Sequence, residues 1–234
     1  MVNRYFLKEY GSWGVMTISS MAGLIAGRQV NLPALASVLS LALLINAKQA
    51  FTVWMRTPPG KRYAPGMIFI LQVLVASALL IPLFQQYGVL ALLPFALFPA
   101  TYLLSLKVLG EHAIQTEVLG FILLSLSALV VKAAAGGGLD ARLFFVIAVF
   151  FTAGVFRVRI QLKKEWLYRA IMIGYVVASV VLFLSLGYRP ILLLPLADNL
   201  IFAVTRYRVG LATTGWIEMT KGFAFLLLMV VFGY

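Results

Sequence analysis

The sequence predicts an all-α integral membrane protein: a single transmembrane domain over residues 1–234, built as a bundle of about nine helices. Hydrophobic residues make up 63% of the chain and the mean hydropathy is +1.02, whereas soluble proteins are about 45–50% apolar. The apolar stretches are continuous rather than alternating, which favours helices over a closed barrel. Because a helix needs about 20 residues to cross a bilayer, nine spans nearly exhaust the chain and leave no room for a soluble domain.

Polar residues or helix-breaking residues bound each predicted span. The first span is short, and either is tilted or begins nearer Tyr5. Proline has no backbone N–H and restricts the residue before it, so Thr57-Pro58-Pro59-Gly60 ends the second span. Gly136-Gly137-Gly138 separates the fifth from the sixth. The nine spans are 12–27, 30–55, 65–85, 88–107, 114–135, 140–160, 166–187, 189–205 and 214–233.

The segment after the sixth span, Arg157 to Lys164, alternates polar and apolar residues as a strand does. An open strand at the end of a membrane helix would leave backbone groups unpaired. We therefore expect a helical extension of the sixth span.

Positive charge is distributed unequally between the two faces of this bundle. When the loops are assigned alternately, about fifteen of the 19 Lys and Arg residues fall on the face that holds the N-terminus. The positive-inside rule then places the N-terminus in the cytoplasm and the C-terminus outside, in the plasma membrane of a prokaryote. Indole rings favour the headgroup level, and the four tryptophans all lie at the same predicted boundary: Trp13, Trp54, Trp166 and Trp216.

The composition excludes several classes of function. The net charge of +12 comes from residues that flank apolar spans, which indicates lipid headgroups or an anionic ligand rather than nucleic acid. Zero cysteines exclude disulfides and thiolate metal sites. The single histidine, His112, argues against a multi-haem cytochrome. His112 with Glu111 and Glu117 has the residue types of a metal site, but a solvated loop beside a helix N-terminus that favours acids is the simpler explanation. We expect neither a metal nor a cofactor.

The candidate ligand-binding residues lie on the basic ends of the second and sixth spans. If the bundle contains a parallel repeat of four helices, these two ends meet over one cytoplasmic opening, where cations suit a phosphate or carboxylate group. The alternative is charge that only sets the topology. The residues of this cluster are Asn46, Lys48, Gln49, Arg56, Arg157, Arg159 and Lys163.

Asp198 is the last candidate, in the middle of the eighth predicted span. A carboxylate at this depth is costly and suggests function. One interpretation is functional: Asp198 carries a proton or accepts a hydrogen bond from a ligand hydroxyl. The other, which is favoured, is an interhelical hydrogen bond or a buried pair with a basic residue of a neighbouring helix. Glu218 and Lys221, three residues apart on the ninth span, are expected to pair with each other; with Arg206 and Arg208 they extend the basic cluster.

Three short segments carry a resemblance to a known family. They are Lys8-Glu9-Tyr10-Gly11-Ser12-Trp13, then Phe156-Arg157-Val158-Arg159, and finally Gly215-Trp216-Ile217-Glu218 with Lys221-Gly222. Together they resemble the YwiC-like membrane proteins, with Tyr10 in place of the usual histidine. The resemblance implies a membrane protein but no particular reaction.

A more distant resemblance is to the UbiA-type prenyltransferases. That likeness implies nine helices, an internal N-terminus, and active-site loops after helices two and six. The family's Asp-rich motifs, which hold magnesium and a prenyl diphosphate, are replaced here by Asn46-Ala47-Lys48-Gln49-Ala50 and Arg157-Val158-Arg159-Ile160-Gln161. The resemblance therefore implies the scaffold without the metal-dependent chemistry.

These observations favour a non-catalytic membrane protein that binds an anionic or polar-headed amphipath, such as an isoprenoid, a quinone or a lipid, in a cytoplasm-facing cavity. A structural or assembly subunit of a respiratory or biogenesis complex, with protein partners in the membrane, is the first alternative. A divergent prenyltransferase, using Glu9, Glu111, Glu117 and Glu218 as magnesium ligands, is another. A small transporter, with a path along Asp198, Asn46 and Gln72, is the last.

Overall fold

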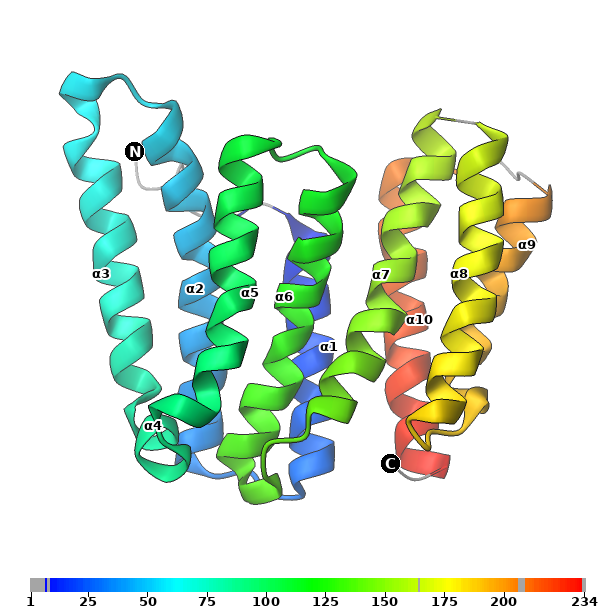
Figure 1. Cartoon of the computed structure of the whole chain (residues 1–234), viewed down its shortest axis with the longest axis horizontal. Helices are drawn as coiled ribbons and strands as arrows, with labels where there is room; N and C mark the ends of the chain where they lie inside the picture. Colours follow the sequence, from blue (N-terminus) through cyan, green and yellow to red (C-terminus); the bar gives the residue numbers. More distant parts are fainter. Residues whose placement is uncertain (1–6, 8, 164, 206–208, 233–234) are drawn as a thin grey trace.

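The computed structural model of the chain describes residues 7, 9–163, 165–205 and 209–232, and within these it is all-α, as predicted (Figure 1). Three short helical turns, η2 (Pro59–Lys61), η3 (Ala133–Gly137) and η4 (Pro190–Leu196), join or extend the longer helices. The longer helices are α1 (Tyr10–Gly27), α2 (Leu32–Arg56), α3 (Tyr63–Leu79), α4 (Ile81–Tyr87), α5 (Val89–Val108), α6 (Ile114–Lys132), α7 (Ala141–Lys163), α8 (Trp166–Ser185), α9 (Ala197–Thr205) and α10 (Leu211–Phe232).

The described helices support a multi-pass membrane protein, with fewer unambiguous spans than the nine predicted. Six are long and apolar enough to cross a membrane: α2, α5, α6 with η3, α7, α8 and α10. The bent pair of α3 and α4 makes up to seven. The other two predicted spans are also helical, but α1 is rich in glycine and serine, and the segment from η4 to α9 is short.

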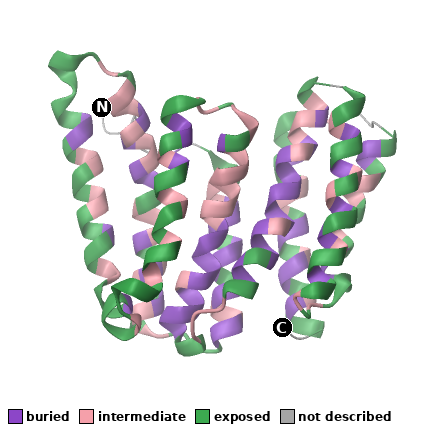
Figure 2. Ribbon diagram, viewed as in Figure 1, coloured by how far each residue is buried: buried purple, intermediate pink, exposed green. Residues whose placement is uncertain are grey.

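Apart from the bent pair of α3 and α4, successive helices run in opposite directions, so the described starts of α1, α8 and α10 lie at the same end of the bundle as the ends of α2 and α7 (Figure 1). The most buried residues lie in the middle, on α6 and α7, whereas α3, α5 and α8 expose one face (Figure 2). Phe150, Phe151 and Phe225 form the aromatic centre of the core where α7 meets α10. In a bilayer the exposed apolar faces meet lipid, which is as apolar as they are.

The predicted breaks are found, with one addition. α2 ends at Arg56, directly before the proline pair. Gly136 and Gly138 have positive φ angles of 85° and 74°, where glycine is favoured, and this ends η3. The predicted span 65–85 is instead bent by 48° between α3 and α4, because Pro82 in the first turn of α4 has no N–H to continue the helix.

The basic segment after the sixth predicted span is helical, as expected, because α7 continues to Lys163. At the opposite end of α7, Asp140 anchors the connection from α6. Its Oδ2 accepts a hydrogen bond from Lys132 Nζ at 2.8 Å, and Oδ1 accepts from the backbone N–H of Arg142 at 3.0 Å. The Lys132 side chain is buried, so this pair closes the end of the bundle away from the basic face.

The pKa of Asp140 lies below its ordinary value. Burial alone would raise it, but the hydrogen bond and the charge of Lys132, with the backbone N–H groups of Leu143 and Arg142, outweigh that effect. A carboxyl whose folded pKa is depressed stabilises the protein above its unfolded pKa of about 3.9, and this contribution is lost as pH falls through the folded pKa.

Asp140→Asn is therefore expected to lower the free energy of unfolding by about 1–3 kcal/mol at neutral pH, because it leaves Lys132 without its carboxylate. The loss, measured by denaturant unfolding in detergent, should shrink as pH falls from about 4 through the lower folded pKa, because the wild-type carboxyl then becomes protonated too. The matched control is Glu9→Gln, which removes a carboxylate from a more exposed pair with Lys48 and should cost less than about 1 kcal/mol. A pH-independent effect of Asp140→Asn would contradict the assignment.

Candidate functional site

A buried network of charged side chains joins α7, α9 and α10. At its centre is Arg157 of α7, whose side chain is 0% exposed. Its guanidinium forms an ion pair with Asp198, and Nη1 lies 3.3 Å from Asn199 Oδ1 and 3.6 Å from Glu218 Oε1. Arg157 also lies over the Phe202 ring at 4.9 Å, an attractive arrangement for a cation. Asp198 is therefore paired with a basic residue of another helix, the interpretation that the sequence favoured.

Lys221 of α10 is the second cation of the network. It pairs with Glu218 one turn earlier, as predicted, donates to Asn199 Oδ1 at 2.5 Å, and lies 3.8 Å from Asp198 Oδ2. Because Asn199 Oδ1 accepts from both cations, the orientation of its amide is fixed. Its Nδ2 is then a buried donor with no acceptor among the described residues.

The backbone of the eighth predicted span explains why Asp198 and Asn199 face this network. Residues 190–196 form the 3₁₀ turn η4, which contains Pro190 and Pro195, and α9 begins at Ala197. Asp198 is thus in the first turn of α9, where the helix dipole favours a carboxylate. Arg169 of α8 holds the other end of α9 by donating to the carbonyls of Ala203 at 2.5 Å and Val204 at 2.8 Å.

On α7, Gly154 makes room for Glu218. A Cβ at residue 154 would lie 3.2 Å from Glu218 Oε2, tighter than ordinary van der Waals contact. The glycine therefore allows α10 to bring its carboxylate beside Arg157.

The four charges of the network balance, but they are not equally accessible. Arg157 and Lys221 supply two cations, and Asp198 and Glu218 supply two carboxylates. The cation side chains are 0% and 6% exposed, whereas the carboxylate side chains are 33% and 26% exposed. The two carboxylates are therefore the more exposed charges of the network.

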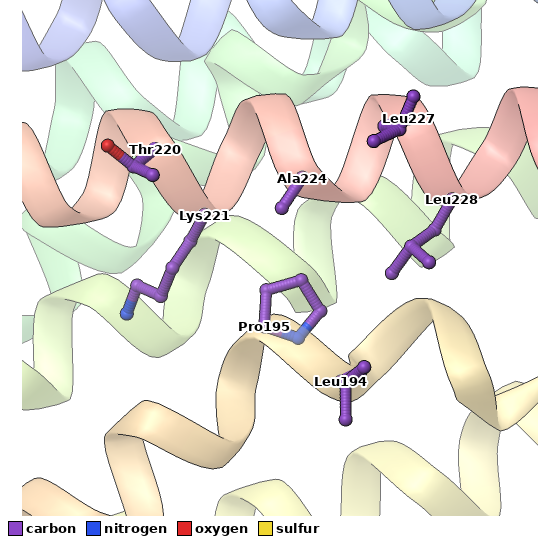
Figure 3. A pocket seen from close by; sticks show the side chains of 7 residues that line it. All are labelled: Leu194, Pro195, Thr220, Lys221, Ala224, Leu227 and Leu228. Carbon is purple, nitrogen blue, oxygen red and sulfur yellow. The ribbon is translucent and has the colours of Figure 1, made fainter.

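A hollow of about 300 Å³ lies next to this network, between η4 and α10. Its wall is almost entirely apolar. Figure 3 shows the Lys221 side chain leaving α10 beside Pro195, with its ammonium group at the end of the hollow farthest from Leu228. We call this hollow the η4–α10 groove; its lining residues are Leu194, Pro195, Thr220, Lys221, Ala224, Leu227 and Leu228.

The other predicted ligand-binding residues lie elsewhere. Lys48 on α2 pairs with Glu9 at 3.1 Å and with Glu111 at 3.6 Å, and Arg56 pairs with Glu111 at 2.9 Å. Asn46, also on α2, accepts a hydrogen bond from the Leu7 backbone N–H at 3.2 Å. Gln49 is half-buried on the same helix.

Arg159 and Lys163, on α7, do not join the buried network. Arg159 pairs with Glu117 at 2.7 Å and donates to the His112 carbonyl at 2.6 Å. Lys163 is exposed. Lys8, Lys164, Arg206 and Arg208 lie outside the described residues.

The single basic cluster expected over α2 and α7 is therefore divided. Both helices end at the same face of the bundle, but α6 lies between them (Figure 1). The cations of α2 bind acids of the segments around them, and Arg157 is buried rather than lining an opening. The hollow lies beside η4 and α10, away from α2.

Sequence reasoning missed the groove and Asn199. The signal for Asn199 was present: it directly follows Asp198, in a stretch from residue 190 to 204 whose other residues are apolar. The four glutamates considered as magnesium ligands do not form one group: Glu9 and Glu111 share Lys48, whereas Glu117 and Glu218 pair with cations at two other places. Among residues 7, 9–163, 165–205 and 209–232, no group of three or more His, Cys, Asp or Glu side chains is arranged to hold a metal ion.

One protein family, described as YwiC-like protein, matches residues 7–132, which is more than half of the chain. The chain belongs to the YwiC-like family. The YwiC-like match covers α1 to α6 and includes the segment from Lys8 to Trp13, whereas the other two segments of resemblance, and the buried network, lie beyond it. No curated protein and no solved structure matches the chain, and the likeness to UbiA-type enzymes stays a prediction.

Proposed function

We propose that this YwiC-like protein binds a membrane amphipath, with the hydrocarbon chain in the η4–α10 groove and the polar head at the buried network. The observation that carries this proposal is the position of Lys221. Its side chain lines one end of an otherwise apolar groove, and its ammonium group belongs to the network around Arg157.

The physical argument concerns how the site would prefer one amphipath over the other lipids of the membrane. The groove volume of about 300 Å³ is at the lower limit of small-molecule sites. In a bilayer an apolar wall gives no preference for one hydrocarbon over another, because lipid tails are equally apolar. Specific binding therefore needs polar groups at membrane depth, and charged residues there are costly and are generally functional. The network supplies such groups at one end of the groove.

No reaction is part of this proposal. Each carboxylate of the network pairs with a cation, which is the arrangement of a positioning site rather than of a metal centre. The protein would hold its ligand unchanged.

Filling the groove should remove the bound molecule. Ala224→Trp places an indole ring in the groove, and we expect the amount of amphipath that co-purifies with the protein to fall about tenfold. Native mass spectrometry and solvent extraction of the purified protein would measure it. The matched control is Val230→Trp, at an exposed position of the same helix. Equal lipid content in wild type and both variants, or no enriched amphipath in any, would overturn the proposal.

We also propose that the basic face is cytoplasmic, in the plasma membrane of a prokaryote, with the N-terminus inside and the C-terminus outside. The unequal distribution of Lys and Arg supports this orientation. The chain has no cysteine, so single-cysteine variants report directly on sidedness. We expect Lys61→Cys and Lys163→Cys to be shielded from an impermeant thiol reagent in intact cells, and Arg189→Cys to be labelled. Labelling of Lys61→Cys and Lys163→Cys on opposite sides would contradict the topology.

A further inference from the structure

We infer, on the basis of the proposed function, that the head group bound at this network is uncharged and carries a hydroxyl. The expected ligand is a long-chain alcohol or a phenol-headed amphipath rather than a phosphate or an amine. Three features of the described residues lead to this class.

The first is which atoms a ligand can reach. Lys221 lines the groove, and the partly exposed Asp198 carboxylate lies 3.8 Å from its Nζ, whereas Arg157 is fully buried. An ammonium donates hydrogen bonds and a carboxylate accepts them. A head group beside Lys221 and Asp198 must therefore both accept and donate a hydrogen bond, which a hydroxyl does, whereas a quinone carbonyl or a fully ionised phosphate only accepts.

The second is the charge balance. Two cations and two carboxylates within a few ångströms already neutralise one another. An anionic head would approach the carboxylates and be repelled by them, and an ammonium head would leave one uncompensated charge at membrane depth, which is costly. An uncharged donor keeps the balance. The inference differs from the sequence-based expectation that Arg157 holds an anionic head, because the guanidinium of Arg157 is bound by Asp198 and Asn199.

The third is the position of Asp198 relative to the groove. Leu194 and Pro195 line the groove, and Asp198 follows them by about one helical turn, so it lies on the same side of the segment. Lys221, which lines the groove from α10, has its Nζ 3.8 Å from Asp198 Oδ2. A chain seated against Leu194 and Pro195 therefore has its head beside the Asp198 carboxylate.

The test uses three probes with one hydrocarbon chain and different heads: oleyl alcohol, oleylamine and oleyl phosphate. Each is titrated into the delipidated full-length protein in detergent, and binding is followed by native mass spectrometry. We expect oleyl alcohol to bind about tenfold more tightly than oleyl phosphate, and more tightly than oleylamine. Glu218→Gln, which removes one carboxylate and keeps the shape, should reduce the preference for alcohol over phosphate, while its thermal unfolding reports whether the fold persists.

The outcomes separate this inference from the proposed function. If phosphate or amine binds as tightly as alcohol or more tightly, and Ala224→Trp still abolishes binding, the head-group assignment is wrong and the groove proposal stands. If no probe binds, or Ala224→Trp leaves binding of all three unchanged, the groove proposal fails and this inference fails with it. The wild-type comparison requires no variant to fold.

Discussion

Replacing Arg157 by methionine is expected to lower the free energy of unfolding by about 3–5 kcal/mol, the usual result of removing one partner from a buried ion pair. The loss of stability arises from the polar groups that lose a partner when Arg157 is removed. Asp198, with a carboxylate that is two-thirds buried, loses its main partner, and Asn199 Oδ1 and Glu218 each lose one of two cations. Methionine fills most of the volume, so the loss reports on charge rather than on packing.

The measurement is unfolding by denaturing detergent in mixed micelles. The matched control is Lys163→Met, at an exposed position six residues later on the same helix, which should change the free energy of unfolding by less than about 0.5 kcal/mol. If the two variants were equally stable, the network would not be a structural centre of α7, α9 and α10.

A double-mutant cycle tests whether Arg157 and Asp198 contribute to stability as a pair. Asp198→Asn alone removes the main carboxylate partner of the buried Arg157, whereas in the Arg157→Met background it removes a charge that has already lost its main partner. The second substitution should therefore cost at least about 1–2 kcal/mol less in that background. Additive losses would show that Arg157 and Asp198 contribute independently.

Most of the fold could be predicted from the sequence because membrane helices are specified locally. Continuous apolar runs, the prolines after Arg56 and the glycines after Ala135 fix where helices begin and end, without knowledge of their neighbours. The bend before Pro82 and the 3₁₀ turn before Asp198 were less predictable, because an apolar run conceals a break when packing holds the chain on both sides.

The candidate site was less accessible to sequence reasoning because it depends on which helices are neighbours. Charge and spacing identified Arg157, Asp198, Glu218 and Lys221 as unusual, and predicted the pair on α10. They could not show that α7, α9 and α10 meet, or that α6 separates α2 from α7. The apolar wall of the groove has no signal at all in a chain whose residues are mostly apolar.

Close packing of α1 on α6 is the second feature on which the fold strongly depends. α1 presents Gly23 to α6 and Gly27 to the junction of α6 with η3; a spacing of four residues lets two membrane helices approach closely. A Cβ on Gly23 would lie 2.5 Å from the Ala128 carbonyl oxygen, and one on Gly27 would lie 2.5 Å from Ala135 Cβ. The neighbour of Gly23 is backbone, so it cannot move aside without displacing a helix.

Gly23→Leu is therefore expected to destabilise the protein by about 3 kcal/mol or more, because the added side chain must push α1 away from α6. The same unfolding measurement applies, with Gly174→Leu as the matched control. Gly174 is an exposed residue in α8, with no atom within 4 Å of the position of its Cβ, so leucine there removes a poor helix former without a clash and should leave stability unchanged or slightly higher. Equal effects at the two positions would mean that helix propensity, and not the contact between α1 and α6, determines the outcome. A large loss of stability at residue 23 alone would show that the fold depends on the contact between α1 and α6, which lies in the segment that the family match covers.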